Sequence, residues 1–213
     1  MPIARSTVVG AATGALLLAG AVGFGVGLPE LVDDASAVPT LPLKLDDRFV
    51  ALQTVSQEVT GADDERYATF IKETEESEAA AQKVLASQYD DAVVRAYIDV
   101  PDPGSQGMPA QIAVTVVPGD TGLVNPSGPF PVDESGAHYD LEVVDGYRCA
   151  VAWSEPVDDS TGMPTGKEPT GADYRVQCRT ERDGLTYDLY TNGLTPEEVA
   201  SYLDRVLELT EKG

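Results

Sequence analysis

The chain has 213 residues, with 36 acidic residues against 14 Lys and Arg, so its formal net charge is −22. A surface with this charge repels nucleic acids and anionic membranes, so neither is an expected partner. The length and the 42% hydrophobic content suit one domain with a packed core and some attached segments.

The N-terminal region lacks charged residues from Ser6 to Leu28, a run of 23 residues that is long enough to span a bilayer. Arg5 precedes the run and acidic residues follow it, so the positive-inside rule places the N-terminus in the cytoplasm and the rest outside. We therefore expect a signal-anchor transmembrane helix over residues 1–29, a Pro-containing linker over 30–45 and an exported domain over 46–213.

Two features of this region leave alternatives open. Small residues recur every four positions in the run, a pattern that permits close helix packing in a membrane: Ala11, Ala15, Ala19, Gly23 and Gly27. Ala35-Ser36-Ala37 matches an A-x-A cleavage pattern, and cleavage after Ala37 would give a secreted protein in place of an anchored one.

The expected domain begins with helical signals and continues with strands. Asp46 to Val59 is ambiguous and could form a short helix, whereas Thr60 to Tyr89 predicts a long helix capped by Asp63, with glutamates on its solvated side. Alternating segments and turn residues then predict about six strands in a mainly antiparallel sheet, which makes the fold α+β. The expected strands lie around 94–100, 112–116, 141–144, 147–153, 174–182 and 185–191.

The last two strands have the clearest signal, because Asp183-Gly184 favours a two-residue type I′ turn. This turn pairs Cys178 with Leu189 on an apolar face and sets Arg179 opposite Asp188 on the other face. One register satisfies both faces, so we expect this hairpin.

A C-terminal helix follows the hairpin. Thr195 is the expected N-cap, Pro196 occupies the first helical position and Glu198 completes a capping box. An apolar stripe at helical spacing predicts that the helix packs on the sheet: Val199, Tyr202, Leu203, Val206 and Leu207.

The two cysteines, Cys149 and Cys178, both fall on apolar faces of expected strands. In an exported chain with two cysteines, a structural disulfide is the expected arrangement. A redox pair is the alternative, but the sequence has no C-x-x-C spacing.

The sequence contains no recognisable catalytic constellation. His138 is the only histidine, and G-x-S-x-G is absent. A zinc site needs more His or Cys ligands than remain once the cysteines pair. We expect no catalytic, cofactor-binding or metal-ligating residue and no cofactor, although an acidic chain offers carboxylate pairs that a hydrolase could use.

The layout resembles small exported cell-envelope proteins of high-GC Gram-positive bacteria. The shared features are a basic start, an Ala/Gly/Leu-rich span, a Pro-rich linker, one disulfide and a last helix introduced by GLTPEEV, here Gly193 to Val199. The resemblance implies a cell-envelope setting and transfers no catalytic residue.

Together these features predict a single-pass membrane protein whose extracytoplasmic domain is a non-catalytic accessory or ligand-binding module. A membrane protein is a possible partner, and a small-molecule ligand is left open. The alternatives are a structural subunit of an envelope membrane complex and a secreted hydrolase that uses acidic residues.

Overall fold

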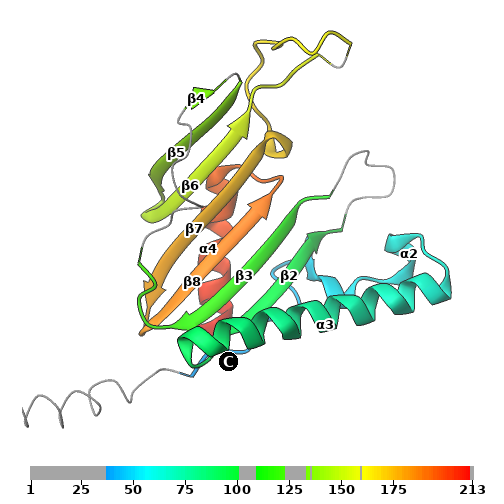
Figure 1. Ribbon diagram of the computed structural model, residues 1–213, viewed down its shortest axis with the longest axis vertical. Coiled ribbons are helices and arrows are strands. Elements are labelled where there is room, and N and C mark those ends of the chain that lie inside the picture. The colour runs from blue at the N-terminus through cyan, green and yellow to red at the C-terminus, as the bar shows by residue number, and fades with distance from the viewer. Residues whose placement is uncertain (1–36, 101–108, 123–132, 135, 159, 212–213) are drawn as a thin grey trace, which may run out of the picture. The chain divides into compact units, whose positions relative to one another are not determined.

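An eight-stranded antiparallel sheet forms the centre of the computed structural model, which describes residues 37–100, 109–122, 133–134, 136–158 and 160–211 (Figure 1). The strands lie side by side in the order β1-β2-β3-β8-β7-β6-β5-β4. They are β1 (Phe49–Ala51), β2 (Val93–Asp99), β3 (Gln111–Pro118), β4 (Asp133–Glu134), β5 (Ala137–Val144), β6 (Tyr147–Ser154), β7 (Tyr174–Arg182) and β8 (Leu185–Asn192). The antiparallel α+β prediction is confirmed, and the strands beyond the expected six include two very short ones, β1 and β4.

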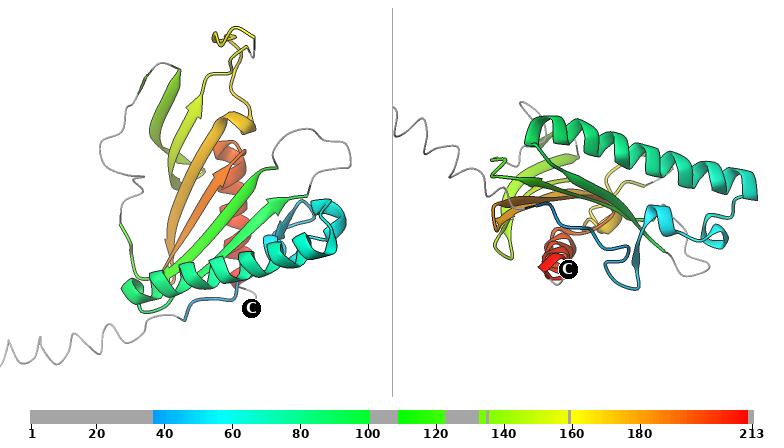
Figure 2. Two further views of the ribbon diagram at one scale, coloured as in Figure 1. Left: turned by 45° about the vertical axis from the view of Figure 1, so that its right-hand side comes forward. Right: turned by 90° about the horizontal axis from the view of Figure 1, so that it is seen from below.

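The helices lie on both sides of this sheet. They are α2 (Gln57–Thr60), α3 (Asp64–Tyr89) and α4 (Pro196–Glu211), with single 3-10 turns η1 (Leu52–Thr54) and η2 (Gly171–Asp173). Figure 2 shows α3 and α4 on opposite faces. The expected long helix and C-terminal helix are both present, and α4 packs on β7 and β8 as predicted.

The last hairpin has the predicted register. Asp183 and Gly184 have φ values of 53° and 73°, as a type I′ turn requires, and Cys178 lies opposite Leu189. On the other face Arg179 lies opposite Asp188. The turn therefore decides which side chains of β7 and β8 face the core.

The core lies between the sheet and α4. Its fully buried side chains include Val114, Leu189 and Cys178 in the middle of the sheet, and Val199 and Leu203 on α4. Leu41 and Leu45, which fall in the expected linker, are also buried here, each with 1% of its surface exposed. The packed part of the domain therefore includes residues before Asp46.

The segment from Asp46 to Val59 is not mainly helical. It contains β1, whose Phe49 is fully buried, then η1 and most of α2. β1 adds to the edge of β2, and beyond the end of β1 the backbone N–H of Ala96 in β2 donates to Glu78 of α3 at 2.8 Å. Glu78 therefore accepts a backbone N–H that β1 is too short to pair. From the sequence, Glu78 was expected on the solvated side of the long helix with the other glutamates.

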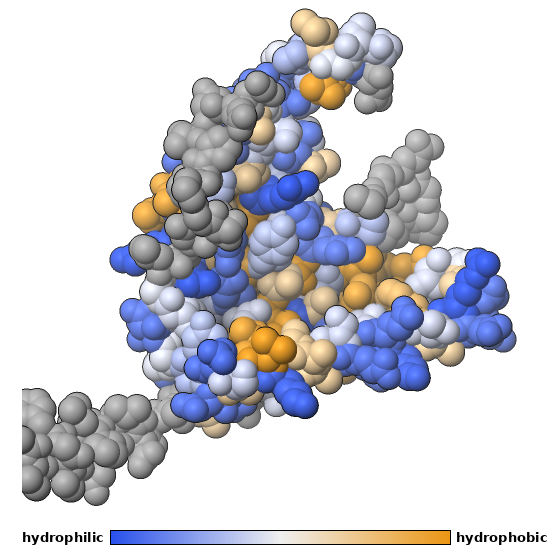
Figure 3. Space-filling model, viewed as in Figure 1, coloured by the Kyte–Doolittle hydropathy of each residue, from blue (hydrophilic) through white to orange (hydrophobic). Residues whose placement is uncertain are grey.

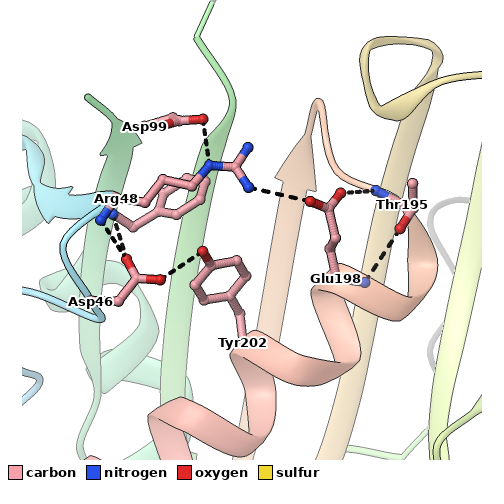
Figure 4. A network of polar contacts seen from close by, with 7 residues as sticks. Asp46, Arg48, Asp99, Thr195, Glu198 and Tyr202 are labelled. Carbon is pink, nitrogen blue, oxygen red and sulfur yellow. Dashed lines mark hydrogen bonds and ion pairs between the residues drawn. The ribbon is translucent and has the colours of Figure 1, made fainter. Parts of the chain in front are cut away.

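A polar network ties the segment just before β1 to β2 and α4 (Figure 4). Arg48 binds Asp99 of β2 at 2.7 Å and Glu198 of α4 at 3.2 Å. Glu198 also accepts the backbone N–H of Thr195, and Thr195 accepts that of Glu198, which confirms the predicted capping box. The network closes where the Tyr202 hydroxyl donates to Asp46 at 2.8 Å.

The predicted disulfide is present. Cys149 of β6 and Cys178 of β7 are direct cross-strand neighbours, joined by an S–S bond of 2.02 Å. Both residues are buried in the core, at 1% and 0% exposure. The bond therefore links two adjacent strands on the face that α4 covers.

The predicted membrane anchor, with its packing residues Ala11, Ala15, Ala19, Gly23 and Gly27, lies outside the described residues. Within the part of the chain that the structure describes, no helix has both the length and the apolar character needed to cross a membrane.

Candidate functional site on the open face of the sheet

The side chains of β5 to β8 that point away from α4 form a surface that we call the open face. The strand register arranges them, with their neighbours on β3, in three rows across the sheet. The rows are Val143, Arg148, Arg179, Asp188 and Thr115; Leu141, Ala150, Gln177, Tyr190 and Ala113; and Tyr139, Ala152, Arg175, Asn192 and Gln111.

This face is open because its helix lies to one side. α3 packs against β2 and β3, and within the described ranges no helix lies over this face of β6 or β7. Figure 3 shows the surface as a hollow above α3, with hydrophilic residues at its centre. Tyr190 in the middle row keeps 42% of its surface exposed.

The charge of the open face is opposite to that of the whole chain. The three rows contain three arginines and one aspartate, and Glu181 of β7 lies on the same face beside them, which leaves a local excess of one positive charge. The complete chain has an excess of 22 negative charges. Positive side chains grouped in such a chain create a local field that favours an anionic ligand.

One ion pair orders one end of this surface. Arg179 and Asp188 lie directly opposite each other, and their closest charged atoms are 2.6 Å apart. Gln177 donates to both Asp188 oxygens, at 3.0 and 2.9 Å. The exposed fractions of the Arg179 and Asp188 side chains are only 19% and 16%, so this group is held rigidly against the sheet.

Two concavities lie at opposite ends of the strands, one at the first row and one at the last. One, of about 270 Å³, is lined by Arg148, Arg179 and Thr186, with Asp120 and Glu181 also among its lining residues. The other, of about 700 Å³, lies at the far end. It includes Arg175, Tyr190, Asn192, Gln111 and Ser154, with Asp173 also in its lining. Its volume lies within the range of small-ligand pockets.

A third concavity follows the outer side of α4, and its lining residues stabilise the fold. It has a volume of about 700 Å³ and is lined by Asp46, Arg48, Glu198 and Tyr202, among others. These four residues already bind one another in the network of Figure 4. We therefore assign this groove to the attachment of the N-terminal segment to α4.

The single histidine lies on the covered side of the sheet, in an aromatic row. The His138 ring stacks on Trp153 with centroids 4.9 Å apart, and Trp153 lies 6.3 Å from Tyr174. His138 Nε2 also binds Glu155 at 3.0 Å. Trp153 and Tyr174 of this row are partly buried and pack against the edge of the core.

Carboxylates gather near this aromatic row. Burial, and then Asp140 and Glu197, raise the pKa of Glu142. Burial is also the main cause that raises the pKa of Tyr174, followed by nearby carboxylates that include Glu197. Across the described ranges, no group of three His, Cys, Asp or Glu residues is placed to hold a metal ion.

Of the site residues predicted from the sequence, the structure brings together Cys149 and Cys178, and the predicted anchor residues lie outside the described ranges. The open-face residues Arg148, Arg175 and Tyr190 were missed, although a signal for them exists. In β7, Arg175, Gln177 and Arg179 alternate with the core residues Val176 and Cys178. The sequence predicts only the pairing of Arg179 with Asp188, because two-sided alternation is ordinary in antiparallel sheets and does not mark a binding surface.

No family model matches this chain, and neither a curated protein nor a solved structure matches it.

Proposed function

We propose that this protein is a single-pass, membrane-anchored extracytoplasmic domain that binds a ligand or protein partner on the open face of its sheet, without catalysing a reaction. The observation that carries the proposal is the contrast between the two faces. One face is sealed by α4, whereas the other presents arginines, amides and Tyr190 around two concavities.

The location rests on the sequence. The uncharged run from Ser6 to Leu28, with Arg5 before it, supports a transmembrane anchor with a cytoplasmic N-terminus. The buried disulfide is compatible with an oxidising compartment outside the cytoplasm. The intact mass of the membrane-extracted protein tests the anchor, since it should include Met1 or Pro2. A mature N-terminus at Val38 would show secretion after cleavage at Ala37.

Photocrosslinking tests the binding surface. A benzoylphenylalanine is placed at Tyr190 on the open face or at Ser201, an exposed position on α4, in the full chain in cells that export it. We expect a discrete adduct from position 190 and none from position 201, with products read by mass spectrometry. Adducts from position 201 alone, from both positions equally or from neither would contradict the proposal.

A structural subunit of a membrane complex remains a second candidate function, because the repeated small residues of the predicted anchor suit helix packing. In that case the stripe is the docking surface, and a partner that stays bound to the wild type in mild detergent should be lost when Ala15→Leu and Ala19→Leu are introduced. Loss of the partner in this variant, together with its retention in a Tyr190→Ala variant, would favour the structural role.

A further inference from the structure

One end of the open face carries two arginines that face each other. The register places Arg148 of β6 directly opposite Arg179 of β7, and like charges in this arrangement destabilise a sheet. Asp188 lies on the far side of Arg179 and binds it at 2.6 Å. Among the described residues Arg148 makes no ion pair, and it is exposed in the concavity that both arginines line. An anionic group placed between these guanidinium groups would remove the repulsion.

A third arginine lies at the other end of the same face. Arg175 is exposed and lines the larger pocket with Tyr190, Asn192 and Gln111. The described part of the chain supplies it with no ion-pair partner either. The amides of Asn192 and Gln111 each offer a donor and an acceptor, the same combination that a peptide backbone presents.

The distance between the two ends suits an extended chain. Arg175 and Arg179 are four residues apart on one strand, which corresponds to roughly 13 Å at about 3.3–3.4 Å per residue. A peptide in the same extended conformation places the side chains of residues i and i+4 on one side at the same distance. Between the two ends, the middle row has short side chains at Ala150 and Ala113, on either side of Gln177 and Tyr190.

We propose that the open face binds an extended acidic peptide segment, with one carboxylate at the Arg148–Arg179 pair and a second, four residues away, at Arg175. The inference rests on the proposed function and adds the chemical class of the ligand. Carboxylates accept the paired N–H groups of arginine in a bidentate geometry, which gives both strength and register.

The negative charge of the whole chain weakens the binding of an acidic peptide but still allows it. The excess of 22 negative charges repels an acidic peptide at long range. At about 0.15 M salt this repulsion is screened beyond roughly 8 Å, whereas contacts with the arginines lie within that distance. The binding measurement is therefore made at this salt concentration.

The test uses three fluorescent peptides and the full chain in detergent. One peptide carries glutamates at positions i and i+4 (Glu-Ser-Ala-Ser-Glu), one carries them adjacent (Glu-Glu-Ser-Ala-Ser) and one replaces both with glutamine. We expect the first to bind most tightly by fluorescence anisotropy. Arg148→Gln and Arg175→Gln should each weaken it by about tenfold, because a hydrogen bond to a charged group is lost. Arg66→Gln is the matched control, since Arg66 is 82% exposed on α3 and should leave the affinity unchanged.

Several results would overturn the inference. Equal affinity for all three peptides, or an equal loss in Arg66→Gln, would show that the arginines do not read carboxylate spacing. Displacement of the first peptide by sodium phosphate at a concentration near the peptide's own Kd would show a small-anion site in place of a peptide site. If position 190 still crosslinks to a partner in cells while the peptides show no preference, the binding surface stands and only its ligand class is wrong.

Discussion

The two faces of the sheet are built from the same strands but have opposite characters. Val114, Leu189 and Cys178 lie side by side on the covered face and are fully buried. One residue along each strand, Thr115, Asp188 and Arg179 lie side by side on the open face. Because successive residues of a strand point to opposite sides, neighbouring positions can separate stability from binding.

Side chains on the two faces should contribute differently to the free energy of unfolding. A large apolar side chain on the covered face contributes roughly 1.5–3 kcal/mol by its burial. Substitutions at exposed positions usually change stability by no more than about 0.5 kcal/mol.

The largest loss is expected at the centre of the covered face. Leu203 of α4 is fully buried, and Leu203→Asp would bury a charge without a partner. Since domains of this size have stabilities of only about 5–15 kcal/mol, we expect the variant to be largely unfolded by circular dichroism. Removal of everything after Gly193 should have the same effect.

Ser201→Asp is the matched control, because Ser201 is on the same helix but exposed. It should melt within a few degrees of the wild type. If Leu203→Asp melts together with this control, α4 does not contribute to the core, and its apolar stripe would then be a surface for a partner.

The disulfide gives the next effect. Replacing both Cys149 and Cys178 with alanine removes a cross-link that closes a sequence separation of 29 residues. The chain-entropy model gives a loss of about 3.6 kcal/mol for a loop of this size. Urea unfolding should show this loss with an unchanged far-ultraviolet spectrum, whereas free thiols in protein taken from the envelope would contradict the structural role.

Loss of the helix cap should have a smaller effect. Thr195 and Glu198 exchange hydrogen bonds at the start of α4, and Thr195→Ala should lower the free energy of unfolding by about 1 kcal/mol. Thr195→Ser keeps the hydroxyl and serves as the control in the same urea titration. Equal stability of the alanine and serine variants would show that the cap is unimportant.

The covered face should also lose stability in alkali. Burial, and then the hydrogen bond to Asp204, raise the pKa of Tyr147 to about 12. In the unfolded chain a tyrosine has a pKa near 10, so the folded state holds this proton more tightly. The contribution is therefore complete below about pH 10 and is lost as the pH rises towards about 12.

The substitution Tyr147→Phe checks this sign. The variant should lose less stability than the wild type between about pH 8 and pH 11, although some loss remains because burial also raises the pKa of Tyr97 and Tyr202. Urea titrations at the two pH values measure the difference. An identical pH dependence in both proteins would mean that Tyr147 does not contribute.

Much of the covered face could be predicted from sequence, because local rules decide it. Asp183-Gly184 sets the last hairpin, Thr195 begins α4 and alternation places Cys178 in the core. β1 could not be predicted, since a three-residue strand carries little periodic signal and depends on the distant edge of β2. The burial of Leu41 is equally non-local.

The open face was harder to recognise for a different reason. Each of its residues is ordinary for the solvated side of a strand, and only the arrangement across strands distinguishes it. Arg148 and Arg179 are 31 positions apart in the numbering and become opposite neighbours only when β6 pairs with β7. The alternation of Arg175 and Arg179 within β7 was visible, but α3's position to one side of the face was not.

The most direct test of the separation between the two faces is the stability of a triple open-face variant of the full chain, Arg148→Gln, Arg175→Gln and Tyr190→Ala. The variant leaves the Arg179–Asp188 ion pair and the whole core intact. We expect its free energy of unfolding in urea to stay within about 1 kcal/mol of the wild type, since all three side chains are exposed. A loss of several kcal/mol would show that these side chains support the fold, and would contradict the assignment of the open face to binding.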